Sequence, residues 1–557
     1  MTWTRGRHAF KSGGEFRAGA NDERRDRGSS GVLSFSPLYT SAAGAAGTGS
    51  ALATFLLGAV NAGSVQSSDW IRTRAQYAAG YAQDDWRATP RLTLSYGLRY
   101  DVEFPRREIG DRMNGFDPVA INPVSGTPGV VTFAGVSGAP RRAYRSDWNN
   151  IGPRVGVAYQ IGGSHRTVVR GGAGVFYGQS VSATIGDVAS LGFSTSASFV
   201  VAQAATQYAF LLRDGFPAYS RPPLDAGFGA VPIGQRTTTS VAYFDPNQVA
   251  PTSYQTHVSI QHELASGLVV ETGYVGNEGR HLTGADLTRN QVPPGLVTTG
   301  DTQLARPFPQ FSNVTLINPS IGRSSYHAVF ARAQKRFAGG FSLLAHYTWS
   351  RFYDDVASTD EYGSLVSYMD AYRRDLDWAR SGSDVPHHAV ATLLYELGVV
   401  SQNRLVRGLL MGWRVGALVT VMSGPPFTVT TTANTTNAFP AGPLRPDLIA
   451  DPQLRPAERT LTRWFDTAAF VNPAPLAFGT APRSVLRGPG LATCDLTLEK
   501  SVPIAGGVRM ELRVEAFNVF NHANFNLPGS TLGAPDFGVI SSARPGRTIQ
   551  LGGRFRF

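Results

Sequence analysis

The residues best able to carry chemistry are two pairs of adjacent aspartates, Asp84–Asp85 and Asp354–Asp355. Two carboxyl groups that face one cleft can act as acid and base on a glycosidic bond. Both pairs stand at the ends of strand-like segments, next to turns or loops. We therefore expect them to bond turns and cap strand ends rather than to catalyse a reaction.

A second group that could carry chemistry is His387–His388, shortly after Asp384. A zinc site needs further cysteine or histidine ligands at a suitable spacing, and none follows here. The single cysteine, Cys494, excludes an internal disulfide and stands in an alternating pattern with no histidine nearby. The sequence therefore predicts neither a metal site nor a catalytic thiol.

The glycine-rich stretch Gly171–Gly174 has the composition of a phosphate loop, but a phosphate loop is followed by a helix. Here Val175–Tyr177 continues a strand-like pattern, so the small residues predict close packing within a sheet. No G-x-S-x-G motif is present either. We expect no catalytic residue and no cofactor, and the sequence does not predict an enzyme.

The composition of the 557 residues favours strands and turns. There are 62 glycines, 11% of residues are aromatic and only 16% are charged. No apolar run is long enough for a transmembrane helix, and Ala51–Val60 predicts a buried loop or a short helix. The net charge of +11 is spread along the chain, with no basic tract, so we expect no nucleic-acid partner.

Strict alternation is the strongest pattern in the sequence. Between Val508 and Ala516, every second residue is apolar, and the residues between them are all charged: Arg509, Glu511, Arg513 and Glu515. Segments of about ten residues with this dyad pattern are typical of a membrane β-barrel, with the apolar face on lipid and the polar face in a water-filled lumen. We expect these four charged residues to face the lumen.

The connections alternate between short and long, as in outer-membrane barrels with tight periplasmic turns and long external loops. The short ones are Trp86–Pro90, Gly162–His165, Ala265–Gly267, Ala338–Gly340 and Ala505–Gly507. The long ones cover approximately 104–149, 178–252, 281–324, 354–386 and 423–490. Ligand contact is expected from the last four of these loops. Trimming residues 430–455 is expected to spare folding and to affect only binding.

These connections leave about fourteen strands in an all-β, antiparallel transmembrane barrel. They lie near 8–18, 74–85, 91–103, 150–161, 166–177, 253–264, 268–280, 325–337, 341–353, 387–398, 411–422, 491–503, 508–521 and 546–557. The orientation that follows from short periplasmic turns places the C-terminus in the periplasm.

The final segment, Arg547–Phe557, ends on phenylalanine and alternates throughout. Its apolar face consists of Ile549, Leu551, Gly553, Phe555 and Phe557. A last strand of this kind resembles the assembly signal of outer-membrane proteins, which implies recognition by the barrel-assembly machinery.

Several further stretches, in this order, resemble the Oar-like group of TonB-dependent receptors. They are Tyr81–Asp101, Tyr347–Arg351, Gly412–Trp413, Ser423–Phe427, Arg487–Gly490 and Glu515–Phe525. The resemblance runs from about Trp3 to Phe557. It implies a Gram-negative outer-membrane transporter that takes up a bulky ligand and is driven by the TonB complex.

Members of this group carry a signal peptide, a carboxypeptidase-regulatory-like N-terminal domain, a TonB box and a plug before a barrel of about 22 or more strands. None of these parts is visible in this sequence. We therefore expect residues 1–557 to be one domain, the C-terminal portion of the barrel, with TonB reached only through a plug outside this sequence. We also expect an open or strained wall, without a ladder between 8–18 and 547–557.

Two other functions remain open. A passive outer-membrane channel or surface-adhesion barrel without energy coupling is the first alternative. A soluble, β-rich secreted enzyme is the second. The ligand is not identified by the sequence.

Overall fold

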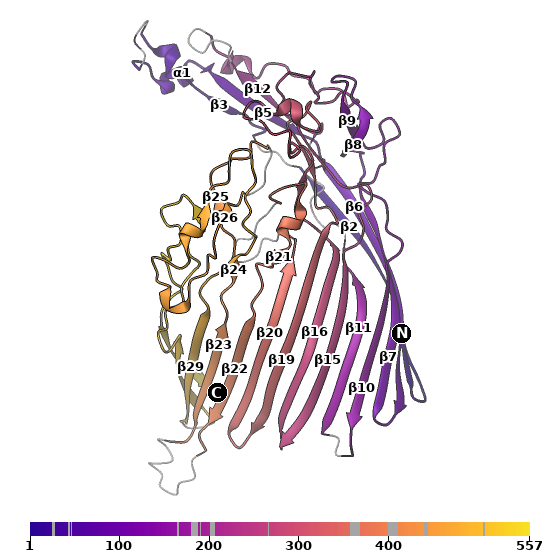
Figure 1. The fold of residues 1–557 in the computed structure, drawn as a ribbon, viewed down its shortest axis with the longest axis vertical. Coiled ribbons are helices and arrows are strands. Elements are labelled where there is room, and N and C mark those ends of the chain that lie inside the picture. The colour runs from indigo at the N-terminus through magenta and orange to yellow at the C-terminus, as the bar shows by residue number, and fades with distance from the viewer. Residues whose placement is uncertain are drawn as a thin grey trace.

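The computed structural model describes residues 1–557 except for 25–27, 43–44, 46, 164–165, 180–187, 190, 201–206, 266, 357–367, 399–409, 439–443 and 505–506. Parts of the expected turns Gly162–His165, Ala265–Gly267 and Ala505–Gly507 lie outside the described residues. One large antiparallel sheet dominates the molecule, with short connections at one end and folded loops at the other (Figure 1). No described helix is long and apolar enough to cross a bilayer.

The large sheet has 16 strands, of which all but β21 form one continuous path. In the order of the path they are β1 (Thr2–Arg5), β2 (His8–Glu23), β6 (Ile71–Thr89), β7 (Leu92–Glu108), β10 (Ile151–Ile161), β11 (Thr167–Tyr177), β15 (Thr252–Ala265), β16 (Leu268–Leu282), β19 (Gly322–Ala338), β20 (Phe341–Asp354), β22 (His387–Glu396), β23 (Trp413–Met422), β29 (Leu491–Pro503), β30 (Arg509–Phe517) and β32 (Thr548–Arg556). The order of the strands in the sheet follows the order in the sequence.

The all-β fold and the fourteen strands predicted from the sequence are confirmed, but the count was too low by two. The additional strands are β1 and β21 (Ala379–Arg380), which pairs with the end of β20. Both are shorter than the ten-residue window in which alternation can be recognised. The hairpin between β19 and β20 shows why the short turns were easy to find, since Gly339 and Gly340 both adopt positive φ angles, 62° and 77°.

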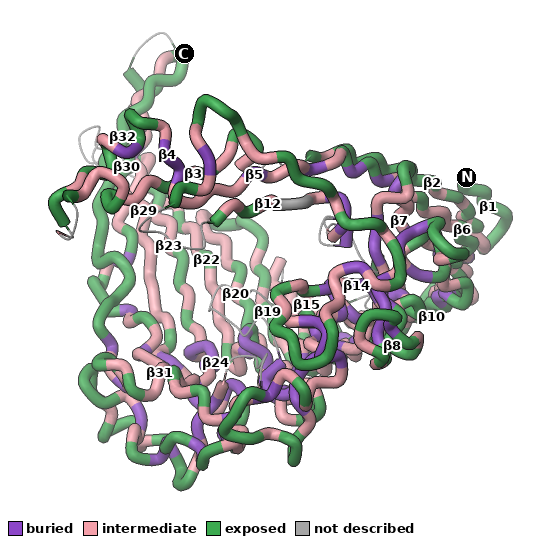
Figure 2. Tube along the Cα trace, turned by 90° about the horizontal axis from the view of Figure 1, so that it is seen from above, coloured by how far each residue is buried: buried purple, intermediate pink, exposed green. Residues whose placement is uncertain are grey.

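The two edges of the sheet do not pair with each other among the described residues. β32 pairs only with β30, and the outer side of β2 pairs only with the four residues of β1. Viewed from above, the two ends of the chain lie at opposite ends of a curved wall, with β3, β5 and β12 between them in the view (Figure 2). The expected absence of a ladder between 8–18 and 547–557 is therefore observed.

The long connections fold into smaller elements of their own. Their strands are β3 (Val32–Ser34), β4 (Ala59–Val60), β5 (Ala62–Ser68), β8 (Asn114–Ile121), β9 (Pro128–Phe133), β12 (Ser194–Val200), β13 (Phe210–Leu211), β14 (Ser240–Tyr243), β17 (Leu287–Thr288), β18 (Asn313–Leu316), β24 (Pro426–Phe427), β25 (Thr430–Thr431), β26 (Asp447–Leu448), β27 (Phe470–Val471), β28 (Leu486–Arg487) and β31 (Thr531–Leu532). The helical turns are α1 (Ala51–Leu56), η1 (Pro37–Thr40), η2 (Leu212–Asp214), η3 (Gln303–Ala305), η4 (Arg374–Asp377), η5 (Pro456–Glu458) and η6 (Thr467–Ala469).

Hydrophobic packing is concentrated in these loops rather than in the wall. One cluster joins residues from four loops and includes Phe116, Phe133, Phe311 and Val314. A second cluster, around Phe465, lies within 423–490 and extends to the loop after β30. The loops therefore form a packed layer above the sheet, which we call the loop layer.

Candidate functional site

The wall has one apolar face and one polar face, and the strand register makes each face continuous. Val157 on β10 lies opposite Leu94 and Gly171, and Val419 on β23 lies opposite Ala391 and Cys494. We call this side the apolar face. Its side chains are strongly exposed for apolar residues: Val155 is 59% exposed, Val258 56% and Leu551 76%.

The charged residues predicted from the alternation all lie on the other side, which we call the polar face. Their partners there are also polar: Arg513 lies opposite Glu499, and Glu515 lies opposite Thr497. Arg556 on β32 reaches Glu511 at 3.0 Å, and Arg513 reaches Glu515 at 2.7 Å. The fourth residue, Arg509, lies opposite Arg556 at the short-turn end.

The C-terminal strand continues the apolar face. Ile549 lies opposite Ala516, Leu551 opposite Val514, Gly553 opposite Leu512 and Phe555 opposite Met510. Phe557 follows the last residue of β32 and is fully exposed. These five residues thus share one side of the wall, as their alternation predicts.

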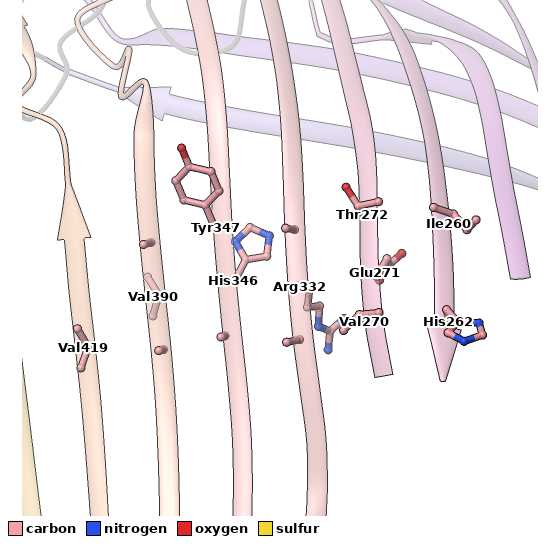
Figure 3. A pocket seen from close by; sticks show the side chains of 15 residues that line it. Ile260, His262, Val270, Glu271, Thr272, Arg332, His346, Tyr347, Val390 and Val419 are labelled. Atoms are coloured by element: carbon pink, nitrogen blue, oxygen red, sulfur yellow. The ribbon is translucent and has the colours of Figure 1, made fainter. Parts of the chain in front are cut away.

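A shallow hollow of about 560 Å³ lies on the wall across β15, β16, β19, β20, β22 and β23 (Figure 3). Its floor is made largely of small side chains, including Ala331, Ala345 and Ala391, with Tyr347 and Val419 beside them. These five residues belong to the apolar face by register. Hydrocarbon can fill such a surface, but it offers little to orient a polar ligand.

A second space of about 560 Å³ lies inside the loop layer, between the β8–β9 hairpin and residues 224–226 and 244–246. Phe116 and Phe133 line it, and each also stacks edge-on against other aromatic rings of the layer. Asn114, 4% exposed, donates through Nδ2 to the carbonyl oxygen of Ala242, while its Oδ1 accepts no hydrogen bond from a described residue. Asp117, Arg142, Arg145 and Asp225 also line the space, so it is a chamber with both aromatic and charged walls.

The predicted aspartate pairs do not form a catalytic site. Asp84 accepts a hydrogen bond from Tyr96 and contacts His8 at 2.6 Å on the apolar face, whereas Asp85 bonds Lys11 on the polar face. Successive strand residues point to opposite sides, so the two carboxyls cannot share a cleft. The expected role in turns is wrong for this pair, because both residues bond across strands.

Asp354 and Asp355 hold the loop layer on the wall instead of bonding a turn. Asp354 pairs with the buried Arg483, and Asp355 accepts from the amide and the guanidinium of Arg323. Asp384 likewise accepts from Arg487 and from the amide of Phe352. These contacts tie the loops over 354–386 and 423–490 to each other and to the wall.

The histidines and the glycine stretch also have structural surroundings. His387 contacts the Tyr347 hydroxyl at 2.7 Å, and His388 lies opposite Thr348 on the other face. Among the described residues, no group of three potential metal ligands occurs. At Gly172, a Cβ atom would meet the His257 ring at 2.6 Å, which explains a small residue there.

Two of the sequence motifs meet in space. Ser423–Phe427 and Arg487–Gly490 pair through β24 and β28. A Cβ atom on Gly424 would lie 1.9 Å from the carbonyl oxygen of Gly488, so only glycine allows this approach. The sequence showed the glycines but not the contact between them.

Buried charge also stabilises the loop layer. Arg445 and Asp377 have side chains that are 1% and 5% exposed, with 2.5 Å between Nη1 and Oδ1. Arg445 also donates to the carbonyl oxygen of Leu376. Nearby, burial raises the pKa of Tyr368 to about 12, so its hydroxyl stays protonated at neutral pH.

We expect Arg445→Ala to destabilise the loop layer by about 3–5 kcal/mol, because it leaves Asp377 buried without its partner. Arg455→Ala, whose side chain is 84% exposed, is the matched control and should change little. Limited proteolysis of both variants measures the difference. Equal protection would contradict a structural role for Arg445.

This result revises the expectation for residues 430–455. Deleting this segment removes the buried Arg445, so the deletion is expected to disturb the loop layer rather than to spare folding.

With this geometry established, comparison with known families is decisive. Residues 1–550 match the model of the family described as "Outer membrane beta barrel domain". This chain belongs to that family. This membership agrees with the predicted outer-membrane location and the all-β fold class.

Solved structures similar to this barrel domain include the outer membrane transporter YddB from Escherichia coli (9% identity, TM-score 0.45, 99% of this chain and 61% of that chain). The ferric yersiniabactin uptake receptor FyuA from Yersinia pestis is also similar (11% identity, TM-score 0.41, 100% of this chain and 56% of that chain). The siderophore receptor PiuA from Acinetobacter baumannii is similar as well (8% identity, TM-score 0.42, 100% of this chain and 54% of that chain). The barrel domain spans less than two thirds of the length of each. No curated protein matches it.

Proposed function

We propose that the barrel domain is part of the wall of an outer-membrane transporter of the TonB-dependent, Oar-like type, which takes up a bulky ligand. The observation that carries this proposal is the exposed apolar face, continuous across the strands from β7 to β32. In water so large an apolar surface would promote association, whereas in a bilayer it contacts lipid.

In this proposal the polar face lines the lumen. Arg509, Glu511, Arg513 and Glu515 would then stay hydrated. The short turns, together with the C-terminus, would lie in the periplasm, and the loop layer would lie outside the cell. The apolar face of β32, ending in Phe557, would be the surface that the barrel-assembly machinery recognises.

The loop layer supports ligand capture. Its chamber has a volume within the usual range for small-molecule sites and combines aromatic walls with the free acceptor of Asn114. Two aspartates and two arginines also line the chamber, so an amphipathic ligand with aromatic and polar groups suits this combination.

The unpaired edges support a larger barrel. Since an unpaired backbone group in hydrocarbon costs several kcal/mol, β2 and β32 require further strand partners in the membrane. We propose that this sequence is the C-terminal portion of such a barrel and that a plug domain elsewhere in the same protein connects it to the TonB complex.

Conductance separates this proposal from a passive channel. In planar lipid bilayers, the product of the complete gene is expected to pass no steady current, because a plug closes the lumen. In a separate binding assay, the same protein is expected to retain the purified periplasmic domain of the energy-coupling partner. A steady current without retention of that domain would favour the passive channel instead.

A further inference from the structure

A pocket of about 280 Å³ in the loop layer is lined by three arginines, Arg380, Arg459 and Arg487, and by Trp464. Among the described residues that line it, none carries a carboxylate. Only Arg487 has an acidic partner, Asp384, and it also donates to the carbonyl oxygens of Asp384 and Gly424. The pocket therefore carries uncompensated positive charge.

The other two guanidinium groups are available. Arg380 is half-buried and its backbone pairs with Tyr353, but no hydrogen bond or ion pair of its guanidinium group is found in the part of the chain that the structure describes. Arg459 donates only Nε, to the carbonyl oxygen of Leu454, and lies 5.4 Å from the centre of the Trp464 ring. The acidic residues nearest to Arg459 along the chain are already paired, Glu458 with Arg455 and Asp466 with Arg463.

The floor of the pocket is rigid. The Trp464 indole donates from Nε1 to the carbonyl oxygen of Arg487 at 2.8 Å, and Phe465 beside it is 1% exposed within the second hydrophobic cluster. The Arg487 head group is held on Asp384, which also accepts from the amide of Phe352. A fixed tryptophan and a fixed guanidinium pre-organise the site, which reduces the entropy lost on binding.

The register places the pocket beside the outer side of the wall. Arg380 lies opposite Tyr353. Tyr353 is two residues beyond Arg351 and four residues beyond Trp349, so all three share the apolar face. The Tyr353 and Trp378 rings also stack, with centroids 6.4 Å apart. Arg380 thus lies where the apolar face ends towards the loops, the level of lipid head groups in the proposed membrane placement.

From this geometry we propose that Arg380, Arg459 and Arg487 form a binding pocket for a phosphate group. Guanidinium groups bind phosphate oxygens in bidentate geometry, and charge-assisted hydrogen bonds are stronger than neutral ones. The phosphate can come from an outer-leaflet phospholipid or glycolipid, or from a phosphorylated solute. Only the lipid source rests on the membrane placement proposed above.

The test compares the product of the complete gene with its double variant, Arg380→Gln with Arg459→Gln. Neither side chain has an acidic partner to lose, and Arg487 is left intact because it holds Asp384. Arg455→Gln is the control, since it removes one positive charge from an 84% exposed position in the same loop as Arg459. Heat-modifiable migration on gels verifies that all three proteins fold alike.

Equilibrium dialysis in neutral detergent measures binding of labelled inorganic phosphate. We expect saturable binding by the wild type and by Arg455→Gln, and an affinity reduced at least about tenfold in the double variant, the effect of losing about 1.4 kcal/mol. No binding by the wild type, or equal binding by all three proteins, would overturn the proposal.

A second arm identifies the source. Each protein is reconstituted with phosphorylated or dephosphorylated lipid A, re-extracted, and assayed for retained lipid. Selective retention of the phosphorylated form by the wild type and the control assigns a lipid head group. If the wild type binds inorganic phosphate, lipid A does not compete for that binding, and no lipid is retained, the source is a soluble phosphate. If the retained amount of lipid is the same for phosphorylated and dephosphorylated lipid A, and the same for the wild type and the double variant, the proposal is contradicted.

Discussion

In the product of the complete gene, Val419→Arg is expected to impair folding into lipid vesicles strongly. Val419 lies on the apolar face opposite Ala391, midway along β22, and is 36% exposed. An arginine near the bilayer midplane costs about 2–4 kcal/mol, which corresponds to a factor of roughly 30–1000 in the folding equilibrium. Urea titrations of folding into vesicles of defined lipid measure this difference.

The neighbouring position provides the matched control. Thr420 lies on the polar face, opposite Val390 and Thr493, so Thr420→Arg introduces the same side chain towards the proposed lumen. Its folding equilibrium should stay within about 0.5 kcal/mol of the wild type. A similar loss in both variants, or a larger loss at Thr420, would reverse the assignment of the faces.

The structure also shows where the same substitution should have little effect. Leu512 lies opposite Lys500, whose ammonium group donates to the carbonyl oxygen of Met411 and lies 5.2 Å from the Trp413 ring. This position is at the short-turn end of the wall, where a long cationic side chain can reach the interface. Leu512→Arg is therefore expected to cost about 0–1 kcal/mol, and Arg513→Gln less.

The second large effect concerns the open edges. The chain of 557 residues on its own is expected to aggregate or to insert incompletely, because the full length of β32 and most of the outer side of β2 offer unpaired backbone groups to hydrocarbon. Expression together with the coding region that precedes it should restore a heat-modifiable, protease-resistant barrel. Both products are compared in the same vesicles.

Closure of the chain on itself is the outcome that contradicts this expectation. If residues 8–18 and 547–557 form a continuous ladder in the membrane, the wall is a complete small barrel. Disulfide trapping between cysteines at Ser12 and Leu551, which both lie on the apolar face, in a Cys494→Ala background, detects that ladder. Efficient cross-linking in vesicles would exclude a larger barrel.

The wall was predictable because each of its strands carries a local signal. Alternation with a period of two assigns faces without any knowledge of neighbours, as the segment from Val508 to Ala516 illustrates. Turn glycines such as Gly339 then fix the hairpins. β1 and β21 escaped prediction because four and two residues are too few to show a period.

The loop layer was not predictable in the same way. Its packing depends on contacts between residues far apart in the sequence, such as Arg445 with Asp377, 68 positions away. The arginine pocket likewise joins Arg380 to residues of 453–487. No periodic pattern marks such contacts, and loops rich in Pro and Gly resemble irregular chain whether or not they pack.

The central claim, that the apolar face contacts lipid, is tested most directly by site-specific quenching. In a cysteine-free form of the complete gene product, fluorophores are attached at Val155→Cys and at Arg154→Cys, two adjacent and exposed positions on opposite faces of β10. In vesicles, nitroxide-labelled lipid should quench the label at position 155 and spare that at 154, whereas iodide in water should do the opposite. Equal quenching of both labels by iodide, without quenching by the lipid nitroxide, would contradict the account.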